Sequence, residues 1–130
     1  MTSRPRAVAV ARAECALAEL AHGRKTIGSS ALAELGIAVG PSGGLGRSSF
    51  NATSEPELTL DPTRTIFVQQ GRVRAATVSG YLAQWQSFGE LPAMLVTDRP
   101  GQGTLWHLDG LHRLIAARLV GQPLTANLWR

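Results

Sequence analysis

The chain has 130 residues, a single cysteine and 44% hydrophobic residues, which is the composition of one globular domain. No apolar run approaches the ~20 residues of a membrane-spanning helix, so we expect no membrane partner. The lone thiol of Cys15 excludes an internal disulfide and a zinc site built from several cysteines. Glutamates interrupt the N-terminal segment where a secretory signal is uniformly apolar, and we therefore expect a cytoplasmic protein.

The charge balance favours polyanionic partners. Thirteen basic residues oppose nine acidic ones, giving a net charge of +4, and only Lys25 among the basic residues is a lysine. Arginine suits phosphate because its planar guanidinium donates two parallel hydrogen bonds. A GC-rich genome produces the same arginine-rich composition without selection for binding, so both explanations stay open.

The N-terminal part of the chain is predicted to be helical. Residues 5–22 are alanine-rich and start with a proline, which predicts a helix that ends at Gly23. A second short helix is predicted to start at Ser29 or Ser30 and to stop at Gly36 or Gly40. Residues 1–39 are thus expected to be an N-terminal helical extension. Residues 40–64 are rich in Gly, Ser and Pro and are predicted to be a linker or lid.

The C-terminal half alternates between strand and helix patterns. Residues 65–70 predict a strand, and residues 77–88 predict a helix with one apolar face. Strands are predicted over 92–97 and 104–108, a third helix over 111–120 and a last strand over 124–129. This order of strand, helix, strand, strand, helix, strand predicts an α+β domain with a small mixed sheet over residues 65–130.

The most informative segment joins the strand over 104–108 to the third helix. Asp109 ends the strand, Gly110 permits a tight turn, and His112 and Arg113 lie in the first helical turn. Free backbone N–H groups and the helix dipole favour an anion there, and Arg113 adds a guanidinium while His112 supplies a donor or a proton shuttle. The pattern favours phosphate over a neutral ligand.

A structural interpretation of the same residues competes with this one. In it, Asp109 caps the helix and Arg113 is merely solvated. A cation in the first turn of a helix is unfavourable by ~0.3–1 kcal/mol, which argues against capping as the whole explanation. Three further arginines, Arg72, Arg74 and Arg118, are expected either to form a basic patch around the segment or to be solvated separately.

The segment DGLHRLIAARLVG at residues 109–121 resembles the D-G-x-H-R-x-x-A-A-x-x-x-G signature of the ParB/sulfiredoxin-like superfamily, which includes ParB-like nuclease domains. The resemblance covers roughly residues 60–130 and implies a ParB/sulfiredoxin-like fold there, in a bacterial protein or one encoded by a phage in a bacterial host. It implies that Gly110, His112 and Arg113 bind the phosphates of a nucleotide. It places Asp109 beside those phosphates and a metal ion.

The resemblance also implies what the site does. It makes Asp109 and His112 the candidate catalytic residues of a nuclease or NTPase, with Mg²⁺ and ATP, ADP or CTP as candidate cofactors and a homodimer as a candidate assembly. Leu111 stands where sulfiredoxins carry their reactive cysteine, which excludes that activity. Gln69 and Gln70 stand where kinase-like members carry a glutamate, and an amide is no general base.

Gln69, Gln70 and Arg72 are expected to support the site without catalysing a reaction. A metal site made by the protein alone, from His107, Asp109 and His112, is not expected; Mg²⁺ bridging a nucleotide to Asp109 fits its ligand preference better. The alternatives to a hydrolase are a non-catalytic module that senses nucleotide or binds DNA, and a structural or host-interaction protein on an inactive scaffold.

Overall fold

The computed structural model describes residues 4–40, 54–69, 72–98 and 104–129. The helices are α1 (Arg4–Ala21), α2 (Ser29–Ala33), α3 (Ala75–Phe88) and α4 (Leu111–Leu119). The strands are β1 (Thr26–Ile27), β2 (Ile37–Val39), β3 (Ser54–Leu60), β4 (Ile66–Val68), β5 (Val73–Arg74), β6 (Met94–Thr97), β7 (Leu105–Asp109) and β8 (Leu124–Trp129). The protein therefore has the predicted α+β architecture, and after residue 65 the predicted elements occur in the predicted order, with the short strand β5 added between β4 and α3.

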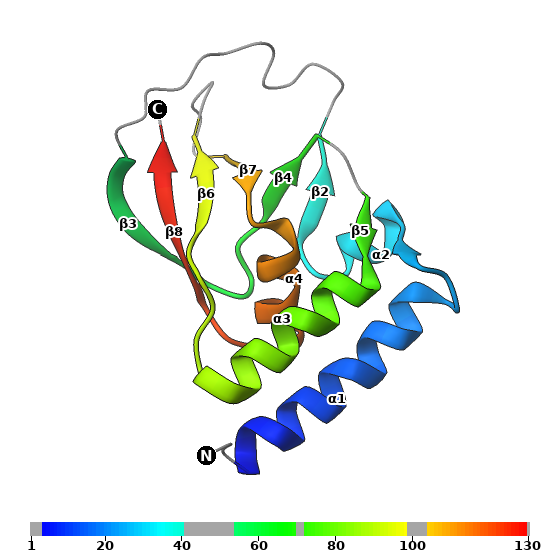
Figure 1. Ribbon diagram of the computed structural model, residues 1–130. Coiled ribbons are helices and arrows are strands. Elements are labelled where there is room, and N and C mark those ends of the chain that lie inside the picture. Colours follow the sequence, from blue (N-terminus) through cyan, green and yellow to red (C-terminus); the bar gives the residue numbers. More distant parts are fainter. Residues whose placement is uncertain (1–3, 41–53, 70–71, 99–103, 130) are drawn as a thin grey trace.

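Two sheets organise the chain. Six strands form a mixed sheet in the order β2-β4-β7-β6-β8-β3, and β1 pairs with β5 in a separate antiparallel ribbon. Helix α4 packs against the larger sheet, and α1 and α3 lie side by side on the outer side of α4 (Figure 1). The apolar faces of all three long helices and of the sheet join in one hydrophobic core.

The N-terminal segment is more than the predicted helical extension. Helix α2 has five residues, and the chain turns at Gly36 (φ +74°) into β2, which pairs in parallel with β4. The fully buried Ile37 lies opposite Ile66 in that pairing. Helix α1 contributes Leu17 to the common core. Residues 4–40 therefore complete the sheet and the core of the C-terminal domain.

The prediction of a linker or lid over residues 40–64 is wrong for residues 54–60. These residues form β3, which pairs antiparallel with β8 at the other edge of the sheet. Leu60 is buried opposite Leu124, because the two leucines at positions 58 and 60 share the face that turns toward the core. The strand was missed because only two large apolar side chains mark it. Residues 41–53 of the predicted linker lie outside the described residues.

A buried arginine joins three parts of this fold. Arg118, near the end of α4, is only 9% exposed and donates from Nη1 to the Leu35 carbonyl (2.7 Å) and from Nη2 to the Arg64 carbonyl. A Cβ on Gly36 would lie 2.8 Å from Nη1, so glycine is needed there for the close approach as well as for the turn. Burial lowers the pKa of Arg118, and nearby Asp61 opposes that shift. Arg118 thus belongs to the interior and not to a surface patch.

No helix in the described part of the chain combines the length and the apolar character needed to cross a bilayer.

Replacing Arg118 with methionine tests its structural role. Methionine keeps an unbranched apolar stem but loses the donors, leaving the Leu35 and Arg64 carbonyls without these partners. We expect the free energy of unfolding to fall by about 2–4 kcal/mol, measured by urea denaturation. The matched control is Arg12→Met on the exposed side of α1, which should change stability by less than about 0.5 kcal/mol. Equal losses in the two variants would contradict the assignment.

Candidate functional site

The predicted site lies at the edge of the sheet where β4 and β7 end. These strands are parallel, with Ile66 opposite Leu105, so their carboxyl ends meet at the same edge. Asp109 is the last residue of β7, and the exposed Gln69 directly follows β4. Helix α4 starts from this edge after one intervening residue. Open sheets that contain parallel strands commonly bind their ligands at such an edge.

Gly110 makes the turn from β7 into α4. Its φ of +100° lies in the left-handed region, which glycine adopts without strain. A Cβ at this position would lie 2.7 Å from the Met94 Cβ and 2.9 Å from Arg113 Nη2. The predicted need for glycine is therefore steric as well as conformational, because the Arg113 side chain folds back over the turn.

Asp109 does not cap α4. The residue at the cap position is Gly110, and no side chain accepts a hydrogen bond at this helix start. Asp109 Oδ2 instead forms an ion pair with Arg113 Nη2 at 3.2 Å. The capping interpretation is wrong, and the first turn of α4 keeps backbone N–H groups without a side-chain acceptor.

Arg113 is a largely buried cation that is only partly paired. Its side chain is 15% exposed, whereas that of Asp109 is 71% exposed. The Arg113 Nε atom is buried and, among the described residues, has no hydrogen-bond partner. A buried N–H without an acceptor costs ~1–3 kcal/mol, so a ligand oxygen at this position would be stabilised. The guanidinium is held by Asp109 at Nη2 while Nε remains available.

His112 joins α4 to the start of α3. Its Nε2 accepts a hydrogen bond from the backbone N–H of Arg74 (3.1 Å), which requires Nε2 to be unprotonated. Burial lowers the pKa of His112, and the Arg74 charge lowers it further. The neutral ring then carries its proton on Nδ1, an assignment that follows from the hydrogen bond. With its Nε2 lone pair occupied, His112 is a positioning group and a donor rather than a general base.

The remaining predicted residues lie as follows. Arg72 is exposed, two residues before Arg74, and Gln70 lies outside the described residues. Leu111 is buried against the core. Burial also lowers the pKa of His107. The charge of Asp109 opposes this shift, and the charges of His112 and Arg113 reinforce it. His107 therefore lies within electrostatic range of the other three groups. Within the described ranges, no group of three His, Cys, Asp or Glu residues could hold a metal ion.

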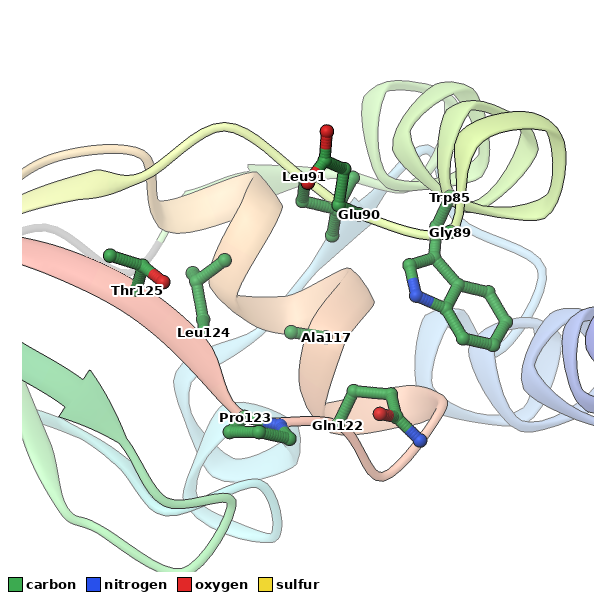
Figure 2. Close-up of a pocket in the computed structure, with 9 residues that line it drawn as sticks. All are labelled: Trp85, Gly89, Glu90, Leu91, Ala117, Gln122, Pro123, Leu124 and Thr125. Carbon is green, nitrogen blue, oxygen red and sulfur yellow. The ribbon is translucent and has the colours of Figure 1, made fainter.

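Sequence reasoning missed two features. The first is the Arg74 backbone N–H, whose position depends on the pairing of β5 with β1 and on no local pattern. The second is a hollow of about 150 Å³ at the opposite end of α4, between Trp85, Glu90, Ala117 and Gln122 (Figure 2). None of its nine lining residues is basic, so its chemistry does not suit a phosphate.

Comparisons of the chain with protein-family models, with curated proteins and with solved structures found no match.

The histidines predict how stability depends on pH. Folding lowers the pKa of His112 and of His107 below the ordinary value of 6.5. At a pH near or below 6.5, the unfolded chain therefore binds more protons at these two side chains than the folded chain does. The free energy of unfolding should therefore be highest above about pH 6.5 and fall as the pH drops below it. His112→Gln should flatten this slope in urea denaturation from about pH 7 to pH 5.

The matched control for this measurement is His22→Gln, which removes an exposed imidazole from the turn after α1. We expect it to keep the wild-type slope. A slope that is unchanged in His112→Gln, or flattened equally in His22→Gln, would show that the link between His112 and Arg74 does not cause the pH dependence.

Proposed function

We propose that this protein binds the phosphate of a nucleotide or of a nucleic acid at the start of α4, through Gly110, His112 and Arg113. The observation that carries this proposal is the Arg113 guanidinium, buried beside a helix N-terminus with Nε unpaired among the described residues. A cation at the positive end of the helix dipole is unfavourable, and a neutral ligand would not offset that cost. A bound phosphate would offset it, because its negative charge interacts favourably with both the guanidinium and the helix dipole.

Backbone donors support the same proposal. The first hydrogen bond of α4 runs from the Leu114 N–H to the Gly110 carbonyl, so the N–H groups of residues 111–113 precede the helical ladder. Such groups, with a glycine turn and an arginine beside them, form an anion-binding geometry. The ParB/sulfiredoxin-like assignment belongs to this proposal as well, and its support is the DGLHR motif together with the α+β order of the elements.

Asp109 affects the proposed phosphate binding through its negative charge. Its carboxylate competes with a phosphate for Arg113 and repels the ligand when no metal is present. A single exposed carboxylate fits Mg²⁺ that is held mainly by phosphate oxygens and water, so Asp109 would hold the metal ion only together with a nucleotide. Mg²⁺ would supply charge neutralisation for the phosphates there.

We favour binding without hydrolysis. A hydrolase needs a general base that removes a proton from the attacking water. Among the described residues of the site, His112 already accepts a hydrogen bond at Nε2, and the Gln69 amide cannot accept a proton. Asp109 is engaged with Arg113. The proposed protein is therefore a nucleotide-sensing or DNA-binding module rather than a nuclease or NTPase.

Arg113→Ala tests the binding site. At a ligand concentration of 100 times the dissociation constant, binding adds ~2.7 kcal/mol to the wild-type stability and raises the melting midpoint. Thermal shifts would be measured with ATP, ADP, CTP and short DNA, with and without Mg²⁺. We expect at least one of these ligands to stabilise the wild type and Arg12→Ala but not Arg113→Ala. A shift that survives in Arg113→Ala places the ligand elsewhere.

Asp109→Asn tests the competition within the site. The neutral amide cannot form the ion pair with Arg113 or repel a phosphate, so affinity for the ligand without Mg²⁺ should rise several-fold, by about 1 kcal/mol. The gain from adding Mg²⁺ should shrink in the same variant. Isothermal titration with and without Mg²⁺ measures both quantities. Affinity that is unchanged without the metal would remove Asp109 from the site.

A further inference from the structure

The β1–β5 ribbon has one buried and one solvent-facing side. Ile27 lies opposite Val73, and both are almost fully buried. Thr26 lies opposite Arg74, and both are exposed because alternate residues of a strand point to opposite faces. Arg72, two residues before Arg74, is exposed as well.

The pairing brings a second basic segment to the same place. The Ala75 N–H donates to the Lys25 carbonyl (2.9 Å), which extends the pairing by one residue beyond β1. Arg24 and Lys25 are both exposed. Arg24 and Thr26 line one hollow of about 400 Å³, in which Glu34 is the single acidic lining residue. We call Arg24, Lys25, Arg72 and Arg74 the basic ribbon.

The basic ribbon adjoins the proposed phosphate site. The Arg74 backbone donates to His112 Nε2, and His112 precedes Arg113 in the first turn of α4. The Arg74 charge also acts on the imidazole of His112, which indicates that the guanidinium lies nearby. In Figure 1, β5 runs directly into the start of α3, and β5 also contacts α4. Four cations from distant parts of the chain thus extend the field of Arg113 in one direction.

We propose that the basic ribbon and the start of α4 together bind the sugar-phosphate backbone of double-helical nucleic acid, without reading its sequence. This inference rests on the proposed function for one phosphate and assigns the neighbouring phosphates to Arg24, Lys25, Arg72 and Arg74. A nucleic-acid backbone presents a row of phosphates, so one phosphate can lie at Arg113 while its neighbours lie at the cations of the basic ribbon.

The composition of the ribbon favours a duplex over other polyanions. Residues 22–28 and 72–75 contain one histidine and no Phe, Tyr or Trp, so bases of a single strand would lack their usual stacking partners. Insertion into a membrane interface would need apolar side chains beside the cations. The large hydrophobic side chains exposed in the described ranges, Val8, Val39 and Phe88, belong to other elements. Contacts limited to phosphates carry no base information.

The test is fluorescence anisotropy with a labelled DNA duplex of about 20 base pairs, titrated at about 50–200 mM salt. The variant Arg72→Gln/Arg74→Gln keeps the Arg74 backbone N–H and removes two ribbon charges. Its matched control is Arg4→Gln/Arg12→Gln, which removes two exposed charges from α1. We expect the ribbon variant to bind about tenfold more weakly at low salt and its salt slope to fall by about 1.8, while the control keeps the wild-type slope.

Other outcomes overturn the inference. Equal losses of duplex affinity in the two double variants would mean that binding depends on net charge alone. Tighter binding of a labelled single strand than of the duplex would exclude the duplex as the preferred ligand. No duplex binding, or binding to phosphatidylserine vesicles in its place, would reject nucleic acid as the partner. Thermal shifts with ADP separate the two proposals. If ADP raises the melting midpoint of Arg72→Gln/Arg74→Gln but not that of Arg113→Ala, the phosphate site is supported even where duplex binding is not observed.

Discussion

The fold depends on one buried guanidinium. Arg118 reaches from α4 to the Leu35 carbonyl before β2 and to the Arg64 carbonyl before β4. A buried charge is tolerated only with hydrogen-bond partners around it, so the three segments must come together for the chain to fold. This requirement holds the N-terminal segment at the edge of the sheet. It also explains why residues 4–40 complete the domain rather than extend from it.

Two arginines of the same helix have opposite roles. Arg118 directs its donors at backbone carbonyls of the protein, while Arg113 uses one Nη for Asp109 and leaves a buried Nε without a partner among the described residues. They lie five residues apart and are the same residue type. Their difference comes from position, because Arg113 lies at the positive end of the helix dipole and Arg118 at the negative end. In our proposal the first arginine binds an anionic ligand, whereas the second stabilises the fold.

The proposal of binding without bond cleavage rests on the surroundings of His112. Burial lowers the pKa of His112, and the hydrogen bond from the Arg74 N–H fixes the orientation of its ring. The same bond joins the site to the ribbon formed with β1. A phosphate at the start of α4 would thus be sensed by elements that lie far apart in the sequence. This arrangement suits a protein that responds to a ligand or holds a polyanion.

The sequence by itself determined the elements whose patterns are strong, and it indicated the site motif. Helix α3 follows from its apolar spacing, and the turn at Gly110 follows from a glycine between a strand and a helix. Strands β2 and β3 were not predictable. The three residues of β2 are too few to show a strand period, and β3 has few apolar side chains, so both become strands only when β4 and β8 pair with them. Only the tertiary structure decided that Asp109 pairs with Arg113, that Arg118 is buried, and that Arg74 meets His112. These contacts join residues through hydrogen bonds and burial that no local pattern encodes.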